Sequence, residues 1–151
     1  MAEEYPDILY RGIGQKECID PNGYITAAAF QFEEYKNRPD QYCELSINWN
    51  DDDKSVERLK SQHKPFKENK QFFCCTFIER NNLDFIFKDY KNSKTFDYER
   101  APISEDKEND IDENVYHGNL LINKDISSQL KKNIQHSLAT LAGQKIIYFE
   151  K

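Results

Sequence analysis

One apolar stripe near the end of the chain restricts its possible folds more than any other feature. Apolar side chains recur there at spacings of four, four, four and three residues, at Ile126, Leu130, Ile134, Leu138 and Leu141. This spacing places them on one face of a helix, which must pack that face against another element. Asp125 or Ser127 suits the beginning of such a helix, and Gly143 suits its end. We therefore predict one long helix, at about residues 126–142, in a fold that also contains a sheet.

The sheet is predicted from short segments in which β-branched and aromatic residues are frequent or alternate with polar ones. These segments lie at residues 8–13, 45–49, 71–79, 83–88, 95–99, 116–122 and 144–149. Such segments form strands, and Arg80-Asn81-Asn82 suits a hairpin turn between the third and the fourth. A short helix is expected at about residues 54–61, after the carboxylates Asp51 to Asp53. The chain thus predicts an α+β fold, with a single antiparallel or mixed sheet of about six to seven strands.

Composition places the whole chain, residues 1–151, in a single domain. Of its 151 residues 38% are hydrophobic, and it has five glycines and five prolines. A chain of this length can bury a sizeable core, and this composition excludes collagen-like, disordered and disulfide-dense proteins. The secondary structure of one segment is not decided by the sequence. Residues 26–32 fit a helix by their three alanines and a strand by the alternation of Phe30 and Phe32.

Negative charge is concentrated in one segment. The chain has 21 Lys and Arg against 27 Asp and Glu, a net charge of −6. Residues 104–114 alone contain six acids and one lysine, a net of −5, so the other residues together carry only −1. We predict an exposed acidic loop at residues 101–114, which can dock on a basic partner surface with Ile103, Ile111 and Val115 as apolar anchors.

The four cysteines show no spacing that is typical of a metal site. Cys74 and Cys75 lie in the most apolar segment and are expected to pack on opposite faces of a strand. The sequence predicts no metal ion and no cofactor. It has no signal-peptide pattern at its beginning and no apolar run that spans a bilayer, so we expect a cytoplasmic chain away from membranes.

Three polar residues are candidates for a ligand site. Arg11, between Tyr10 and Gly12, leaves a predicted strand and suits a phosphate or a carboxylate. Ser46 lies within a predicted strand, and His117 lies at the start of another, where a histidine can act as a general base. No pattern in the sequence identifies a catalytic residue.

The order of these residues resembles a set of small uncharacterised bacterial proteins with the pattern YRxI, then (S/T)AAF, then LS, then a late His. The matching residues are Tyr10, Arg11, Ile13, Thr26, Ala28, Ala29, Phe30, Leu45, Ser46, Ile47 and His117. The resemblance implies a bacterial, cytoplasmic chain in which Arg11, Ser46 and His117 converge. It also implies a setting in a small operon, such as a defence or toxin-related locus.

The first 50 residues or so also resemble the ADP-ribosyltransferase fold. In that fold an early strand carries an Arg in a YRG-like context, as Tyr10-Arg11-Gly12 does here, and a later strand carries a Ser, as Ser46 does. The resemblance implies a nucleotide or NAD site built from Tyr10, Arg11, Ser46 and His117. The chain departs from the family because it has no Ser-Thr-Ser stretch and no Glu-x-Glu turn after the aromatic strands.

A basic stretch gives a further candidate surface. Residues Arg58 to Lys70 contain five basic residues and one acid, with Phe66 among them. Basic residues interleaved with aromatic ones are typical of single-stranded nucleic-acid binding. The residues that would contact the nucleic acid are Lys60, Lys64, Lys67 and Lys70.

The predicted function is a binding or accessory module for a protein partner, because no motif indicates a catalytic site. Such a module is expected to expose an apolar patch or a sheet edge. One alternative is a nucleotide- or NAD-binding enzyme or sensor, which requires Arg11, Ser46 and His117 in one pocket. A second alternative, nucleic-acid binding, requires the basic residues on one face. The sequence specifies no oligomeric state.

Overall fold

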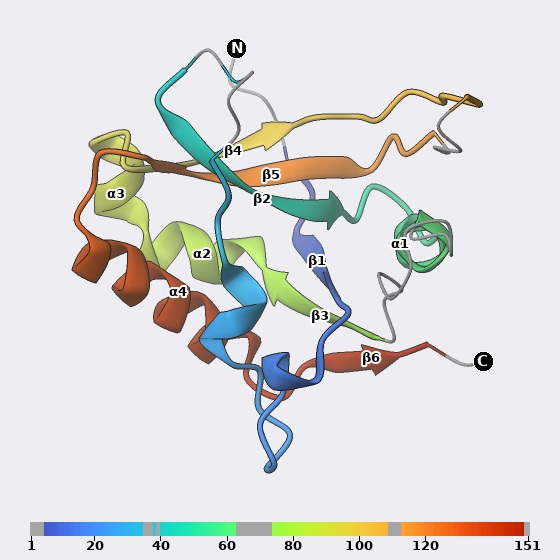
Figure 1. The fold of residues 1–151 in the computed structure, drawn as a ribbon, viewed down its shortest axis with the longest axis horizontal. Coiled ribbons are helices and arrows are strands. Elements are labelled where there is room, and N and C mark those ends of the chain that lie inside the picture. The colour runs from blue at the N-terminus through green and yellow to red at the C-terminus, as the bar shows by residue number, and fades with distance from the viewer. Residues whose placement is uncertain (1–4, 35–37, 39, 63–73, 109–112, 150–151) are drawn as a thin grey trace.

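A computed structural model describes residues 5–34, 38, 40–62, 74–108 and 113–149 of the chain. In this part six strands form one antiparallel sheet with the order β4-β5-β2-β1-β3-β6 (Figure 1). The strands are β1 (Ile8–Ile13), β2 (Tyr42–Trp49), β3 (Cys74–Glu79), β4 (Phe96–Arg100), β5 (His117–Asn123) and β6 (Ile146–Tyr148). The α-helices are α1 (Ser55–Gln62), α2 (Arg80–Ile86), α3 (Lys88–Asn92) and α4 (Ser128–Ala142). The predicted α+β class with a single sheet is confirmed.

The long helix α4 covers one face of the sheet and contributes to the main core. Its residues Ile134 and Leu138 are buried in a cluster with Leu45 and Ile47 of β2 and Leu120 of β5. These helix residues belong to the apolar stripe, so the predicted stripe is the packing face. Burying large aliphatic side chains in this way is a major source of stability, because each contributes about 1.5–3 kcal/mol.

Both ends of α4 have the capping residues that the sequence suggests. Ser127 Oγ accepts a hydrogen bond from the backbone nitrogen of Leu130 at 3.1 Å. Gly143 ends the helix with φ of 55°, in the left-handed region that favours glycine. Among the described residues, no helix is long and apolar enough to cross a membrane.

The segment predicted as a strand at residues 83–88 is helical instead, within α2 and the beginning of α3. The predicted hairpin turn at Arg80 forms the first turn of α2. Leu83 and Phe87 are buried, whereas Phe85 between them is 84% exposed. In a strand these three side chains would share one face, so their burial fits only a helix. A short apolar run does not distinguish a strand from a helix by itself, and here packing on the main core decides.

Two further segments of the sequence prediction can be compared with the structure. Residues 26–32, which fit both a helix and a strand by sequence, contain a 3-10 helix at Ala27–Phe30. Ala29 and Phe30 of this short helix are buried in the main core. The predicted strand at residues 71–79 is observed as β3, and its first three residues lie outside the described part.

The second face of the sheet is divided into two halves. Over β1, β3 and β6 it is apolar and is covered by α1, whose Leu59 packs with Tyr10 and Cys75. Over β2, β5 and β4 it is mostly polar, because every second residue of a strand points to the same side and most of these residues are polar, with the buried Leu121 of β5 as an apolar exception. We call this half the polar face, and it comprises Glu44, Ser46, Asn48, Glu99, His117 and Asn119.

Candidate functional site

The strand register brings the residues of the polar face side by side. Asn119 of β5 lies opposite Ser46 of β2 on one side and opposite Glu99 of β4 on the other. His117, two residues before Asn119, lies opposite Asn48. Directly opposite residues of antiparallel strands have Cβ atoms about 4.5–5.5 Å apart. The register therefore makes one continuous surface from three strands that are distant in the sequence.

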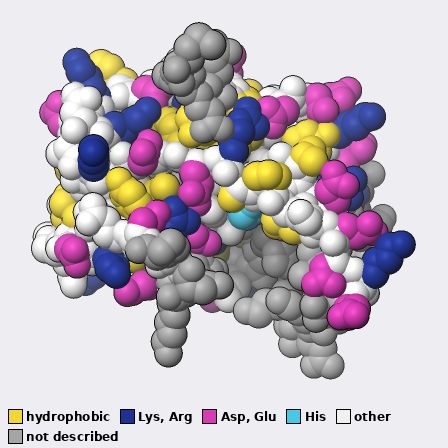
Figure 2. Space-filling view, turned by 90° about the horizontal axis from the view of Figure 1, so that it is seen from above, with side chains coloured by type: hydrophobic (Ala, Val, Ile, Leu, Met, Phe, Trp, Pro, Cys, Tyr) yellow, Lys and Arg dark blue, Asp and Glu magenta, His cyan; other side chains and the backbone are white. Residues whose placement is uncertain are grey.

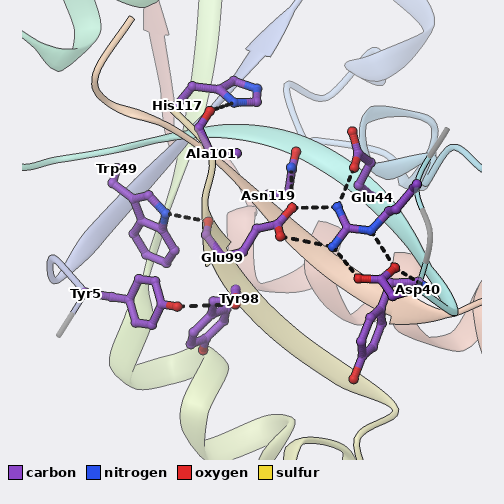
Figure 3. Close-up of polar contacts among 11 residues, drawn as sticks. Tyr5, Asp40, Glu44, Trp49, Tyr98, Glu99, Ala101, His117 and Asn119 are labelled. Carbon is purple, nitrogen blue, oxygen red and sulfur yellow. Dashed lines mark hydrogen bonds and ion pairs between the residues drawn. The ribbon is translucent and has the colours of Figure 1, made fainter. Parts of the chain in front are cut away.

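Arg38 precedes β2 and binds three carboxylates at this surface. Figure 3 labels these carboxylates, which belong to Asp40, Glu44 and Glu99. Its Nε and Nη2 donate hydrogen bonds to Asp40 at 2.7 and 3.0 Å. Its Nη1 and Nη2 donate to Glu99 at 2.7 and 3.0 Å, and Nη1 also donates to Glu44 at 2.7 Å. A guanidinium has five N–H donors, so all the donors of Arg38 are used here. We call these four residues the Arg38 cluster, and its formal charge is −2.

The charges of the Arg38 cluster stabilise one another. Hydrogen bonds from Arg38 hold the pKa of Glu99 and of Asp40 below their ordinary values, although burial acts in the opposite direction. The bonds to Glu99 and Asp40 also raise the pKa of Arg38. Both carboxyl groups are therefore ionised at neutral pH, and the guanidinium stays charged.

Asn119 lies at the centre of the polar face, and only one of the two polar atoms of its side chain has a hydrogen-bond partner in the described chain. Its side chain donates from Nδ2 to Glu99 at 2.7 Å. Its Oδ1 is buried and has no hydrogen-bond partner among the described residues, and the residue as a whole is 2% exposed. Figure 3 shows this side chain between Glu99, Glu44 and His117. Buried acceptors without a donor are rare in folded proteins, because they cost about 1–3 kcal/mol each.

His117 is partly buried beside the same cluster. Its Nδ1 lies 2.7 Å from the carbonyl oxygen of Ala101. A carbonyl oxygen only accepts, so Nδ1 carries the proton and Nε2 of the neutral ring is an acceptor. Burial lowers the pKa of His117, and this outweighs the opposing effects of Ala101, Glu44 and Glu99. The ring is therefore neutral at neutral pH.

The structure places the predicted ligand residues on two different faces. Ser46 and His117 share the polar face, where Ser46 is exposed. Arg11 points to the opposite face, because it alternates with Tyr10, which packs under α1. Its Nε donates to the carbonyl of Ala29 at 2.9 Å, and its Nη1 donates to the carbonyl of Ser46 at 3.0 Å. Arg11 thus meets the Ser46 backbone, while the Ser46 side chain points away from it.

The acidic segment between β4 and β5 forms an arm that projects beyond the sheet (Figure 1). We call its described residues, 101–108 and 113–116, the acidic arm. Its two sides are joined by hydrogen bonds between the backbones of Ile103 and Asn114, at 2.9 and 2.8 Å. Glu105, Glu108 and Glu113 are exposed on it. In its described part, the predicted acidic loop is held at its base by this backbone pairing, and these three carboxylates face solvent.

Buried asparagines fasten the acidic arm to the sheet. Asn114 is 1% exposed, and its Nδ2 donates to Oδ1 of Asn48 at 3.1 Å. Asn48 in turn donates from Nδ2 to the carbonyl of Ser55 at 3.2 Å, and Asn114 Oδ1 accepts from the backbone nitrogen of Tyr116 at 3.1 Å. Buried polar groups that are satisfied in this way hold their segments in one geometry.

The cysteines have the environment of packing residues. Cys74 is buried in the main core and Cys75 is buried under α1, so they face opposite sides of β3 as the sequence suggests. Burial raises the pKa of Cys74 to about 11 and that of Cys75 to about 12. Both side chains are thiols at neutral pH, and a thiol is a weak nucleophile.

Only part of the predicted nucleic-acid surface lies in the described chain. Lys60 is exposed on α1, and Lys64, Lys67 and Lys70 lie outside the described residues. Figure 2 shows basic and acidic side chains interspersed over the described part of the face in view. Within that described part of the chain, no group of His, Cys, Asp and Glu side chains is arranged to hold a metal ion.

Sequence reasoning missed Arg38, Glu99 and Asn119. No motif joins them, because Arg38 and Glu99 are 61 residues apart in the chain. The short-range signal was the charge pattern around Arg38, with Asp40 two residues later and Glu44 six residues later. That pattern indicates an ion pair, and only the register of β2, β5 and β4 adds the other two residues.

Comparisons with known proteins add no relative. No family model, no curated protein and no solved structure matches this chain. What the chain does must therefore be inferred from its own residues.

Proposed function

We propose that this chain is a protein-binding module that engages a basic partner surface through the acidic arm. The observation that carries the proposal is the concentration of charge: residues 104–114 carry −5, and the other residues together carry −1. A projecting segment of one sign produces a strong local field, which attracts a surface of opposite sign and orients its approach.

The anchoring of the acidic arm supports this proposal. Its base is held by the paired backbones of Ile103 and Asn114 and by the buried contact of Asn114 with Asn48. A preorganised segment loses less conformational freedom on binding, so more of the interaction energy appears as affinity. Val115 is 52% exposed beside the carboxylates and offers an apolar contact to the partner.

Three groups that could serve an enzyme, the Arg11 guanidinium and the thiols of Cys74 and Cys75, are hydrogen-bonded to the backbone or buried. Arg11 donates to backbone carbonyls on the face opposite Ser46 and His117. The thiols of Cys74 and Cys75 are buried and protonated. The nucleotide or NAD alternative and the nucleic-acid alternative remain predictions from sequence, and the placement of Arg11 away from the side chains of Ser46 and His117 supports the binding module over the first of them.

The test removes the charge of the acidic arm. The arm-neutralised variant is Glu105→Gln, Asp106→Asn, Glu108→Gln and Glu113→Gln. The matched control makes the same change in charge at exposed residues elsewhere: Glu17→Gln, Glu57→Gln, Glu79→Gln and Asp89→Asn. Binding of a short fluorescent peptide of arginine and leucine is measured by anisotropy at low and at physiological salt.

We expect the arm-neutralised variant to bind this peptide at least about tenfold more weakly than the wild type, because the lost charges are adjacent. The control variant should stay close to the wild type. Equal weakening in both variants would show that only net charge matters and would contradict the proposal. Equal binding of a peptide with glutamate in place of arginine would contradict it as well.

A further inference from the structure

The polar face beside the acidic arm has hydrogen-bond acceptors for which no donor is described. All five donors of Arg38 are used by carboxylates, and the Arg38 cluster keeps a formal charge of −2. Asn119 Oδ1 is buried without a partner in the described chain. Nε2 of the neutral His117 is one more acceptor, because the ring proton is on Nδ1, which donates a hydrogen bond to the carbonyl oxygen of Ala101. A group that fits this surface has to bring N–H donors and positive charge.

Building on the proposed function, we infer that the polar face takes up one cationic side chain of the basic partner, with Asn119 and His117 as its acceptors. A lysine ammonium and an arginine guanidinium share the required chemistry, since each carries positive charge and several N–H donors. An anion such as a phosphate does not fit, because the three carboxylates around Arg38 repel it.

The position of this site is continuous with the acidic arm. His117 is the first residue of β5, and Ala101, to which it donates, directly follows β4. The arm joins the sheet between these two residues. A basic segment bound along the arm therefore ends beside the polar face, where its next side chain meets Asn119 and the Arg38 cluster.

Ser46 is the solvent-exposed residue at the edge of this site. It lies directly opposite Asn119 in the register and is exposed, whereas Asn119 is buried. We place the entry of the incoming side chain beside the exposed Ser46 Oγ, and its donors reach the buried Asn119 Oδ1 only when neighbouring side chains rotate. Hydrogen bonds from a charged donor are about twice as strong as those between neutral groups, which offsets the cost of that rotation.

The test compares two peptides, one of arginine and leucine and the other of lysine and leucine, on the full chain and three variants. Asn119→Leu keeps the side-chain volume and removes the amide, and Asn92→Leu, at an exposed residue of α3, is its matched control. Ser46→Ala changes an exposed residue and leaves the core intact. NMR signals of the Asn119 amide and the His117 ring are followed in the wild type as each peptide is added.

We expect Asn119→Leu to weaken binding of at least one peptide by about tenfold or more. Ser46→Ala should weaken it less, Asn92→Leu should leave it unchanged, and the Asn119 and His117 signals should shift. Binding of the arginine peptide alone identifies a guanidinium site, and binding of the lysine peptide alone identifies an ammonium site. If Asn119→Leu does not fold, the test of the site rests on peptide binding by Ser46→Ala and on the NMR signals of Asn119 and His117 in the wild type.

The two proposals fail in different ways. Unchanged binding by Asn119→Leu and Ser46→Ala, without a shift of the Asn119 signals, would overturn the cationic site. If the arm-neutralised variant still lost binding in that case, the proposed function would stand. If the wild type bound neither peptide, the proposed function would be overturned, and the site with it.

Discussion

Arg38 contributes to the polar face as a cross-link between segments that are distant in the sequence. It joins the segment before β2 to Glu44 of β2 and Glu99 of β4. Its side chain is 14% exposed, so water screens these ion pairs less than it screens pairs at a fully exposed surface. Removing it would leave three carboxylates close together without a counter-charge.

We predict that Arg38→Ala lowers the free energy of unfolding by about 2 kcal/mol. This loss is smaller than that for a fully buried ion pair, because the carboxylates that bind Arg38 are partly exposed. Arg38→Lys should retain part of this stability, since it keeps the charge and loses the two-pronged hydrogen bonds. Urea denaturation at neutral pH measures both. Equal stability of Arg38→Ala and the wild type would show that the Arg38 cluster does not hold these strands together.

At the scale of elements, α2 shows how packing overrides a local pattern. The alternation of Leu83, Phe85 and Phe87 fits a strand as well as a helix by sequence. In the structure Leu83 and Phe87 contribute to the main core one helical turn apart, and Phe85 points to solvent. A strand would place Phe85 and Phe87 on the same face, whereas the helix buries Phe87 and exposes Phe85. Substitutions at these two residues therefore distinguish the two interpretations.

We predict that Phe87→Ala, at a residue 1% exposed, lowers the free energy of unfolding by about 3–5 kcal/mol. Phe85→Ala should change it by no more than about 0.5 kcal/mol, because its side chain already contacts water. Thermal and urea denaturation of the two variants give the comparison. Similar losses in both would indicate that the two side chains share a buried face, as in a strand.

At the scale of the whole molecule, acid should destabilise the fold in two stages. The folded-state pKa of His117 is below its ordinary value of 6.5, so the unfolded chain binds this proton more readily than the folded chain. Stability from this group is present above pH 6.5 and is lost as the pH falls through the lowered pKa. Asp40 and Glu99 have pKa values below their ordinary 3.8 and 4.5, so their contribution is lost at lower pH still.

We predict that the free energy of unfolding begins to fall as the pH drops below about 6.5, and falls again below about 4.5. His117→Gln should abolish the first stage and leave the second. Denaturation curves at closely spaced pH values between 7 and 2 measure both. A first stage of the same size in His117→Gln would assign it to another group.

The sequence alone determined the parts of this molecule that depend on local spacing and on charge. The apolar stripe of α4 and its capping residues Ser127 and Gly143 act within a few turns of one helix, so they can be recognised without the rest of the chain. The charge of the acidic arm is a property of composition, and it survives any fold. Most strands could be located for the same reason, because alternation is a local pattern.

Only the tertiary structure decided which residues meet. The pairing of β2, β5 and β4 places Ser46, Asn119 and Glu99 side by side, and a shift of one residue would turn these side chains to the other face. The same register separates Arg11 from the side chains of Ser46 and His117, which the resemblance to small bacterial proteins implies would converge. Register and long-range packing are set by the energy of the whole core, and no local stretch of sequence contains that information.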